Sequence, residues 1–264
     1  MRIGRWTLLE RLARGGMGET WRATSDDGEL GVVKRVRPGL SGAPLRERFE
    51  LERRALERLN SGALDVSRLL DFGEHDGVPF LVTQWIDGTP IERFLAEHSA
   101  SIDARCDYAV RCAALVGAVH ALGVIHADIK PANLLVDRGG VPHLIDFGLA
   151  QFADEAPRLG DDARLMSPRY AAPEQFRGHP LSFAADVFAL AMTLHELLAG
   201  AHAFSSTATY LELESSCLQG RSLPTTPCGA HIDALLACAH ALDPSRRFRD
   251  ASAFASALRA ALGG

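Results

Sequence analysis

The sequence predicts an α+β protein, in which a small antiparallel β-sheet with one helix, over residues 1–86, precedes a larger and mainly helical part, over residues 87–264. Alternating or β-branched stretches predict the strands, and they lie at 3–12, 19–24, 31–36 and 79–86. Apolar residues at helical spacing predict the helices, the longest of them at 45–60, 103–122 and 183–198. Strands therefore dominate the first third of the chain and helices the remainder.

Length and composition are those of a folded protein. At 264 residues, with 47% hydrophobic and 23% charged residues, the chain can bury a sizeable core in one domain or two packed lobes. Global disorder is thereby excluded. The formal net charge of −5 gives no reason to expect nucleic acid or an anionic membrane as the main partner.

Cysteine usage and hydropathy predict a cytoplasmic location. The five cysteines are an odd number and form no pair of C-x-x-C motifs, so the sequence suggests neither a disulfide framework nor a zinc site. The longest apolar run, at 187–194, is far shorter than the ~20 residues of a membrane span. Arg2 and an expected strand follow Met1 directly, so we expect no signal peptide.

A glycine-rich tip joins the first two expected strands. It has the sequence Ala-Arg-Gly-Gly-Met-Gly at 13–18, where glycine allows positive φ and lets backbone N–H groups approach a phosphate closely. An ordinary glycine-rich turn fits the same residues. The tip alone does not decide between a phosphate site and a plain hairpin.

Lys34 and Glu52 form the first candidate pair. Lys34 lies in the middle of the β-branched strand at 31–36, where a lone lysine usually faces solvent. The helix that follows carries an apolar stripe, and Glu52 falls at the centre of this stripe. Because a carboxylate on a buried face needs a cation, we expect Glu52 to pair with Lys34. The acidic residues off the stripe are expected to be solvated, namely Glu47, Glu50 and Glu57.

The densest polar pattern occupies 126–135 and 144–148. After the helix at 103–122 and Gly123, the chain continues His-Ala-Asp-Ile-Lys-Pro-Ala-Asn-Leu-Leu, and Leu-Ile-Asp-Phe-Gly follows shortly. A buried segment avoids so many polar groups unless they have partners. A carboxylate can take the proton of a hydroxyl, lysine brings a point charge to a phosphate, and Asn and Asp oxygens suit Mg²⁺. Together these groups predict a phosphoryl-transfer site.

In this order the motifs resemble those of the eukaryotic-like Ser/Thr protein kinases of bacteria. The resemblance rests on the glycine-rich tip, the catalytic-loop pattern at 126–135, Asp146-Phe147-Gly148 and the segment at 166–174, and it covers almost the whole chain. It implies a bilobal protein-kinase fold. It also implies transfer of the γ-phosphoryl group of Mg-ATP, or of Mn-ATP, to Ser or Thr hydroxyls of a protein substrate, and it allows autophosphorylation.

The resemblance implies a role for each polar residue of the catalytic pattern. Asp128 would accept the proton of the substrate hydroxyl, and Lys130 would contact the γ-phosphate. Asn133 and Asp146 would be the metal ligands. Ser167 would bridge the catalytic Asp and Lys, which favours Ser/Thr over Tyr substrates.

The nucleotide would be held mainly by the first 86 residues. Lys34, positioned by Glu52, would contact the α- and β-phosphates of ATP. Thr83 would be the gatekeeper behind the adenine, and the backbone of Gln84 and Ile86 would hydrogen-bond the base, although an ordinary edge strand also fits these side chains. The full implied set of nucleotide-binding residues is Ala13, Gly15, Gly16, Gly18, Thr20, Val32, Lys34, Thr83, Gln84, Ile86 and Leu135.

Ala127 is a departure that bears on regulation. Many protein kinases carry an Arg before the catalytic Asp, and this Arg pairs with a phosphate on the activation segment. Ala127 cannot form that pair, and the segment at 146–174 offers only Ser167 and Tyr170 as hydroxyls. We therefore expect activity that does not depend on phosphorylation of this segment.

Three further residues are expected to be structural. Glu174 would form a buried ion pair with Arg247 that ties the activation segment to the larger lobe, and Asp186, in the first turn of the apolar helix at 183–198, would hold the catalytic-loop backbone. Surface charge and an ordinary helix-start carboxylate are the simpler interpretations of these residues.

Two other functions compete with a protein kinase. A small-molecule phosphotransferase of the aminoglycoside or choline kind shares the Asp and Asn pattern but typically lacks an equivalent of Lys130 and the Ala-Pro-Glu segment. A nucleotide-binding pseudokinase would act as a scaffold without turnover. The intact Lys34, Asp128, Asn133 and Asp146 argue against the pseudokinase.

Overall fold

The computed structural model describes residues 1–14, 18–36, 43–156, 166–205, 207–220 and 222–263. The chain divides into two compact units, which are described separately. Unit 1 comprises Met1–Asp87 together with Asp146–Gly148, and unit 2 comprises Gly88–Ile145 and Leu149–Gly264.

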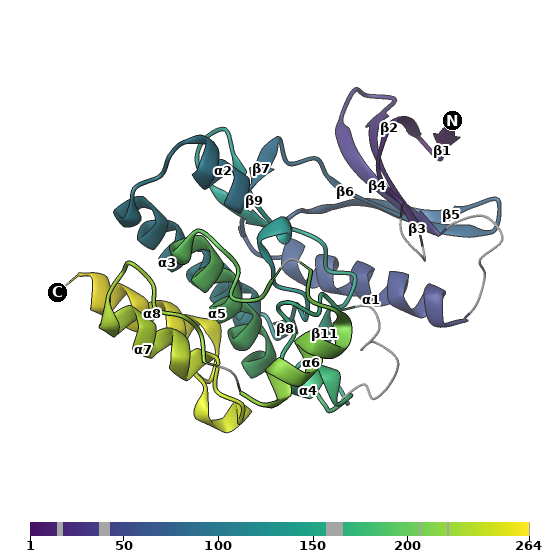
Figure 1. Cartoon of the computed structure of the whole chain (residues 1–264). Coiled ribbons are helices and arrows are strands. Elements are labelled where there is room, and N and C mark those ends of the chain that lie inside the picture. Colours follow the sequence, from purple (N-terminus) through teal and green to yellow (C-terminus); the bar gives the residue numbers. More distant parts are fainter. Residues whose placement is uncertain (15–17, 37–42, 157–165, 206, 221, 264) are drawn as a thin grey trace. The chain divides into compact units, whose positions relative to one another are not determined.

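Unit 1 is built on one antiparallel sheet and one long helix (Figure 1). The sheet has the strand order β1-β2-β3-β4-β6-β5, and every neighbouring pair is antiparallel. The strands are β1 (Arg2–Ile3), β2 (Trp6–Arg14), β3 (Gly18–Ser25), β4 (Leu30–Val36), β5 (Leu69–His75) and β6 (Val78–Gln84). The helix, α1 (Ala43–Asn60), follows β4 in the chain.

Trp6 lies at the centre of the core of this sheet. Its side chain is fully buried, and its Nε1 donates a hydrogen bond of 2.8 Å to Asp71 Oδ2. Gly31 lies directly against it, since a Cβ at this position would come within 2.8 Å of both the Trp6 ring and Val82. A larger residue at 31 would therefore displace the indole.

Two strand boundaries differ from the sequence prediction. The expected strand at 3–12 is divided into β1 and β2, because Gly4 adopts a φ of 55° and reverses the chain between them. The expected strand at 79–86 ends at Gln84, so Ile86 lies beyond it. The edge strand β5 was not predicted, since its sequence mixes polar and apolar residues without regular alternation.

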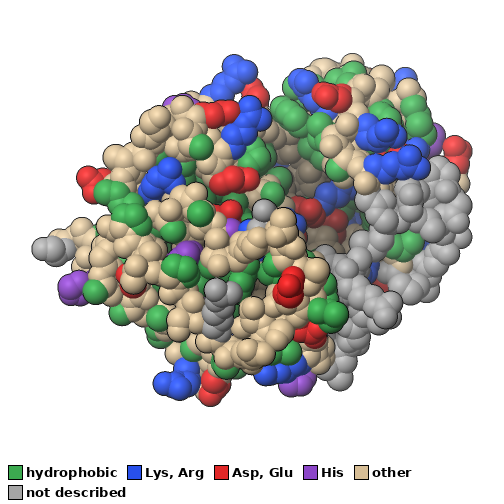
Figure 2. Space-filling model, viewed as in Figure 1, with side chains coloured by type: hydrophobic (Ala, Val, Ile, Leu, Met, Phe, Trp, Pro, Cys, Tyr) green, Lys and Arg blue, Asp and Glu red, His purple; other side chains and the backbone are tan. Residues whose placement is uncertain are grey.

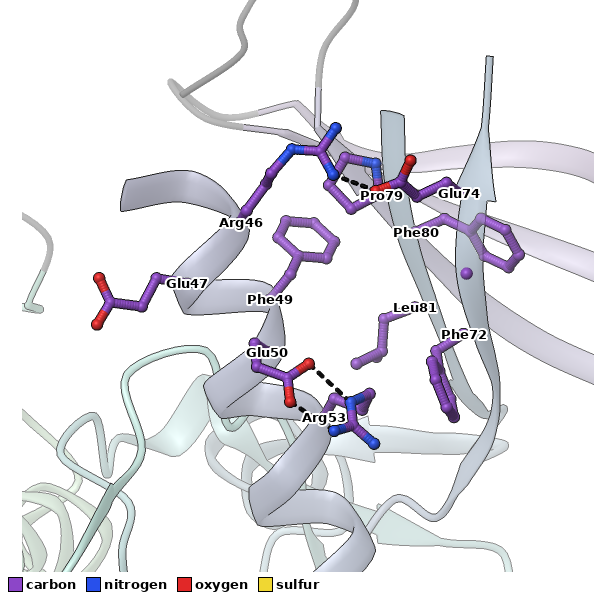
Figure 3. A pocket seen from close by; sticks show the side chains of 11 residues that line it. Arg46, Glu47, Phe49, Glu50, Arg53, Phe72, Glu74, Pro79, Phe80 and Leu81 are labelled. Atoms are coloured by element: carbon purple, nitrogen blue, oxygen red, sulfur yellow. Dashed lines mark hydrogen bonds and ion pairs between the residues drawn. The ribbon is translucent and has the colours of Figure 1, made fainter. Parts of the chain in front are cut away.

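A cavity of about 410 Å³ lies between α1 and strands β5 and β6 (Figure 3). Phe49 of α1 and Leu81 of β6 both point into the space between the helix and the strand. Ion pairs stand at its rim, where Arg46 pairs with Glu74 and Arg53 pairs with Glu50, while Glu47 points away. The cavity is thus apolar inside and charged at its edge. The residues predicted to bind nucleotide or metal are absent from the described residues that line it.

Unit 2 is mainly helical. Its helices are α2 (Ile91–Glu97), α3 (Ile102–Ala121), α4 (Pro173–Phe176), α5 (Phe183–Ala199), α6 (Tyr210–Leu218), α7 (Ala230–Ala239) and α8 (Ala251–Leu262). Short strands form two small sheets, β10 (Pro142–Leu144) with β9 (Leu134–Asp137) and β7 (Gly88–Pro90), and β11 (Gln151–Phe152) with β8 (Val124–Ile125). Short 3₁₀ turns lie at Pro131–Asn133 and Pro244–Arg246 within the described part of the unit.

Helix α5 forms the centre of unit 2. Nearly all of its side chains are buried, and α3, α7 and α8 pack around it (Figure 1). Its boundaries follow from local chemistry: the Ser182 side chain accepts a hydrogen bond from Ala184 N, and Gly200 ends the helix with a φ of 74°. The predicted helix at 183–198 is confirmed to within one residue.

These two units confirm the predicted α+β class. Acidic and basic side chains are interspersed over the face seen in Figure 2. Among the helices of the described residues, none is both long enough and apolar enough to cross a membrane.

Candidate active site

Lys34, Glu52 and Asp146 meet within unit 1. Lys34 Nζ lies in hydrogen-bond contact with Glu52 Oε1 and at 2.6 Å from Asp146 Oδ1. Glu52 is 6% exposed, on the face of α1 that the apolar stripe predicted. The predicted pairing of Lys34 with Glu52 is therefore confirmed, and Asp146 joins it as a second carboxylate.

The charge of Lys34 is stabilised by these neighbours. Burial alone would lower the pKa of Lys34, but the charges of Asp146 and Glu52 outweigh burial and hold this pKa above its ordinary value. Burial raises the pKa of the Glu52 carboxyl, and Lys34 offsets this effect only in part. Lys34 consequently remains a cation throughout the physiological pH range, beside two carboxyl groups.

Strand register places the predicted nucleotide-binding side chains on one face of the sheet. Thr20 is directly opposite Lys34, and Val32 is directly opposite Thr83. Directly opposed residues of antiparallel strands share a face, and Val32 and Lys34 share theirs because they are two residues apart. Ala13, opposite Thr20, extends the same row to β2. These five residues thus share one face of the sheet, in two neighbouring cross-strand rows, one with Ala13, Thr20 and Lys34 and one with Val32 and Thr83.

The other residues predicted to contact the nucleotide do not belong to this group on the sheet and lie in several different elements. The N–H of Gln84 donates to Arg68 O at 2.8 Å, so only the carbonyl of Gln84 is left for a base. Ile86 is 9% exposed, and Leu135 lies in β9, opposite His143. Gly18 begins β3. Two predicted residues lie outside the described residues, Gly15 and Gly16.

The catalytic-loop residues form a connected hydrogen-bond network in unit 2. Lys130 Nζ lies 2.6 Å from Asp128 Oδ2 and donates to Ser167 Oγ at 2.7 Å. The N–H of Ser167 donates to Asp128 Oδ1 at 3.2 Å. Asn133 Nδ2 donates to the Asp128 carbonyl at 2.9 Å and to Asp128 Oδ2 at 3.2 Å. The structure therefore brings together the four residues that the sequence placed there.

Asn133 in unit 2 and Asp146 in unit 1 each carry an oxygen that suits a hard divalent cation. Asn133 turns its Nδ2 toward Asp128, which leaves the amide oxygen as the atom that could bind a metal. Asp146 keeps 45% of its side chain exposed although Oδ1 contacts Lys34. Oxygen donors of this kind suit Mg²⁺, which keeps several water or phosphate ligands and needs only one or two side chains.

Asp186 holds the backbone of the catalytic loop. Its side chain is fully buried, Oδ2 accepts from His126 N at 2.7 Å, and Oδ1 accepts from Ala127 N at 2.8 Å. Burial acts to raise the pKa of Asp186, but the hydrogen bonds, that from His120 foremost, lower it below its usual value. The predicted role of Asp186 is confirmed, and its carboxylate is ionised.

Sequence reasoning missed His120. Its Nε2 lies 3.0 Å from Asp186 Oδ2, and its Nδ1 accepts a hydrogen bond of 3.2 Å from Ala251 N at the start of α8. Because Nδ1 accepts, the imidazole is the neutral form with the proton on Nε2, which donates to Asp186. A histidine in the last turn of a buried, apolar helix was the only signal for this contact.

Ala127 adopts a left-handed conformation, with a φ of 62°. This region is unfavourable for alanine, because its Cβ comes too close to the backbone carbonyl. Gln175 Nε2 donates to the Ala127 carbonyl at 2.9 Å, so both polar groups of this peptide backbone are fixed from α4 and α5. The kink that aims Asp128 is therefore held by side chains on two helices.

Glu174 and Arg247 form the predicted ion pair. Arg247 Nη1 and Nη2 lie 2.7 and 2.9 Å from the two carboxylate oxygens of Glu174, and the Arg247 side chain is fully buried. Arg247 also donates to three backbone carbonyls, at Ala241, Ala184 and Leu242. The bidentate geometry confirms the expected link between the end of the activation segment and the body of unit 2.

A second group missed in the sequence surrounds Glu19, next to Gly18. Glu19 is 9% exposed and accepts a hydrogen bond of 3.0 Å from Arg35, while Arg11 and Arg14 lie within 4 Å. Arg35 holds the pKa of Glu19 below its usual value. Three strands, β2, β3 and β4, are thereby joined at the base of the glycine-rich tip.

Both lysines of the chain belong to these networks. Its 28 basic residues comprise 26 arginines and two lysines, Lys34 and Lys130. Each makes contacts with carboxylates. An ammonium is a compact point charge, whereas a guanidinium is a wide planar fork. Lysine is thus kept only at the two positions where the kinase-like motifs require it.

This fold and these networks are those of a protein kinase. The chain matches the protein kinase domain over residues 6–251, so it belongs to the protein kinase domain family, and the predicted bilobal kinase fold is confirmed.

The curated relatives include several bacterial enzymes. Serine/threonine-protein kinase PknD of Mycobacterium tuberculosis is 32% identical over 268 residues, which cover 98% of this chain and 40% of the relative. PknH of Mycobacterium bovis is also 32% identical, over 98% of this chain and 44% of the relative. PknA of Mycobacterium tuberculosis is 29% identical, over 99% of this chain and 62% of the relative. The chain therefore spans only part of the length of these relatives.

Proposed function

We propose that this chain is a serine/threonine protein kinase, which transfers the γ-phosphoryl group of Mg-ATP to a Ser or Thr hydroxyl of a protein. The observation that carries the proposal is the network of Asp128, Lys130, Asn133 and Ser167, in which each side chain contacts at least one other. Relatives named as serine/threonine kinases support it.

The network gives each side chain a chemical task. Asp128 is an acceptor for the substrate hydroxyl and takes its proton as the new bond to phosphorus forms. Lys130 neutralises charge that develops on the transferred group, and Ser167 fixes the position of Lys130. Catalysis then depends on positioning and on charge neutralisation, with no covalent enzyme intermediate.

The nucleotide and the metal ion would use the other predicted residues. Lys34, fixed by Glu52, would bind the α- and β-phosphates. Asn133 of unit 2 and Asp146 of unit 1 would each offer an oxygen to Mg²⁺, which would neutralise phosphate charge when bound. The shared face of Thr20, Val32 and Thr83 supports binding of the adenine against the sheet.

We further propose that activity does not depend on a phosphorylated activation segment. Ala127 supplies no charged group, and its backbone is already fixed by Asp186 and Gln175. Ser167 is engaged with Asp128 and Lys130. Protein freed of phosphate by a phosphatase should therefore be as active as untreated protein, and activity restored only by rephosphorylation at residues 146–174 would contradict this.

The test is phosphate transfer from γ-labelled ATP and Mg²⁺, to the protein itself and to a generic Ser/Thr substrate such as casein. Asp128→Asn removes the acceptor for the hydroxyl proton, and Lys34→Met removes the phosphate contact. Both should reduce transfer by at least a thousandfold. Arg138→Met is the matched control, since Arg138 is an exposed cation near the tip of the β9–β10 hairpin, and it should retain full activity.

The other outcomes separate the alternatives. Binding of ATP without transfer to any hydroxyl would indicate a pseudokinase. Transfer to an aminoglycoside or choline, with none to protein, would indicate a small-molecule phosphotransferase. Transfer that persists in Asp128→Asn would refute the assigned role of the network.

A further inference from the structure

Two cysteines far apart in the sequence lie together in unit 2. Cys106 in the first turns of α3 and Cys228 in the turn before α7 are separated by 122 positions, yet their Sγ atoms are 3.5 Å apart. Both are free thiols. A disulfide bond is about 2.05 Å long, so the two sulfurs need to approach by roughly 1.5 Å to join.

Both cysteines are held in place by their neighbours. Arg105, next to Cys106, anchors the start of α3 by donating to Leu197 O of α5 at 2.6 Å. On the other side, Thr226 binds Asp233 of α7 through its backbone N and its hydroxyl, at 2.9 and 2.8 Å. The N–H of Cys228 in turn donates to the Thr226 hydroxyl at 3.3 Å. The short distance between the sulfurs is thus fixed by contacts on both sides.

The two thiols differ in access and reactivity. Cys106 is 8% exposed, and burial together with the neighbouring Cys228 thiol raises the pKa of Cys106 to about 12. Cys228 is partly exposed and follows the exposed Pro227 in a turn. An oxidant in solution therefore reacts with Cys228 first, and Cys106 is the second thiol, which reacts with the oxidised Cys228.

We propose that Cys106 and Cys228 are an oxidisable dithiol, which a hydroperoxide converts into an intramolecular disulfide between α3 and the turn before α7. Cys228 loses its thiol proton, and the thiolate attacks one oxygen of hydrogen peroxide, so that the O–O bond breaks and a sulfenic acid forms. The hydroxide that leaves takes up the proton from Cys228 and becomes water. The Cys106 sulfur then attacks the Cys228 sulfur, the S–O bond breaks, and the hydroxide leaves as water with the Cys106 proton. In total two thiols and one peroxide give one disulfide and two waters.

The other three cysteines lack this arrangement in the described residues. Cys217 and Cys238 each donate to a backbone carbonyl, at Ala171 and Arg246. Cys112 is fully buried, and burial raises its pKa to about 12. The disulfide should therefore form at one pair only. The disulfide involves no residue of the network of Asp128 and Lys130. It closes a loop between cysteines that are 122 positions apart, and the stabilisation that a disulfide gives to the folded chain increases with the length of this loop.

The experiment maps the product by mass. Purified protein is treated with hydrogen peroxide, its remaining thiols are blocked with N-ethylmaleimide, and it is digested with trypsin without reduction. Cys228 and Cys238 lie on the same tryptic peptide, at 222–246, so the measurement uses a Cys238→Ser background. The peptide 106–111 should then appear linked to peptide 222–246, and the link should be lost after reduction with dithiothreitol.

Variants and a second readout make the test decisive. Cys106→Ser and Cys228→Ser, each in the Cys238→Ser background, should both abolish the linked peptide. The oxidised Cys238→Ser protein should melt about 5 °C above its reduced form, and the Cys106→Ser variant should show no such rise. Peroxide that yields only sulfinic acid at Cys228, or a link to another cysteine, would overturn the proposal.

Discussion

Arg247→Ala should remove a large part of the stability of unit 2, and Arg247 makes no contact with Asp128, Lys130, Asn133 or Ser167 among its hydrogen bonds. The substitution leaves the Glu174 carboxylate, 5% exposed, without its bidentate partner, and it also removes the donors to three backbone carbonyls. A buried charge that loses its partner costs about 3–5 kcal/mol. Against a total stability of about 5–15 kcal/mol, this loss is a large fraction.

The assay is urea unfolding followed by far-UV circular dichroism, which reports the helices of unit 2, because all three tryptophans of the chain lie in unit 1. At an unchanged slope, a loss of about 4 kcal/mol lowers the midpoint by roughly 1–2 M urea. Arg246→Ala is the matched control, because Arg246 is the adjacent arginine and is exposed, and it should change the free energy of unfolding by no more than about 0.5 kcal/mol.

A double variant separates the ion pair from the packing around it. In Glu174→Gln/Arg247→Met no charge remains buried, so this variant should be more stable than Arg247→Ala. If Arg247→Ala lost less than about 1 kcal/mol, or no more than Arg246→Ala, the ion pair would not be the link that the geometry indicates.

Three further predictions concern individual side chains. Burial first, and then the charge of Arg247, lowers the pKa of His240 to about 4 in the folded chain. Between about pH 6.5 and pH 4, His240 is therefore protonated in the unfolded chain and mostly neutral in the folded chain. Stability should therefore fall as the pH is lowered through this range, by about 2 kcal/mol between pH 7 and pH 5, and urea unfolding of His240→Gln should lack this component. His120→Phe keeps a ring beside Phe183 but removes the donor to Asp186, so we expect kcat to fall about tenfold with an unchanged KM for ATP; an equal change in both would contradict a role through the catalytic loop. Glu19→Gln loosens the base of the glycine-rich tip and should raise the KM for ATP severalfold while kcat stays within twofold, and steady-state kinetics with no change in KM would refute this role.

Contacts that need one residue type at one spacing could be predicted from the sequence. Glu52 was placed by the apolar stripe of its helix, and Asp128, Lys130 and Asn133 were placed by their pattern within a few residues. Because Glu52 was expected on a buried face, it was expected to pair with Lys34, and the structure contains this ion pair. Local periodicity and the cost of an unpaired charge were sufficient for these positions.

Contacts between distant segments could not be predicted in the same way. His120 and Asp186 are separated by 66 positions and Cys106 and Cys228 by 122, and neither pair has a signal other than residue type. The division of the first strand at Gly4 was missed because a single glycine inside an alternating stretch is compatible with a strand. The surroundings of Glu19 depend on strand register, which alternation alone does not fix.

Because its only lysines are Lys34 and Lys130, this protein has very few side chains that react with amine-directed reagents. Apart from the amino group of Met1, these two side chains are the only primary amines in the sequence. Acylating or aldehyde reagents that target amines will therefore meet a surface of arginines that do not react with them. Any acyl group that the folded chain acquires on a side-chain amine must sit on a residue in contact with Glu52 and Asp146, or with Asp128. Once the product at the exposed Met1 amino group is set aside, amine labelling reports how far Lys34 and Lys130 are accessible to the reagent.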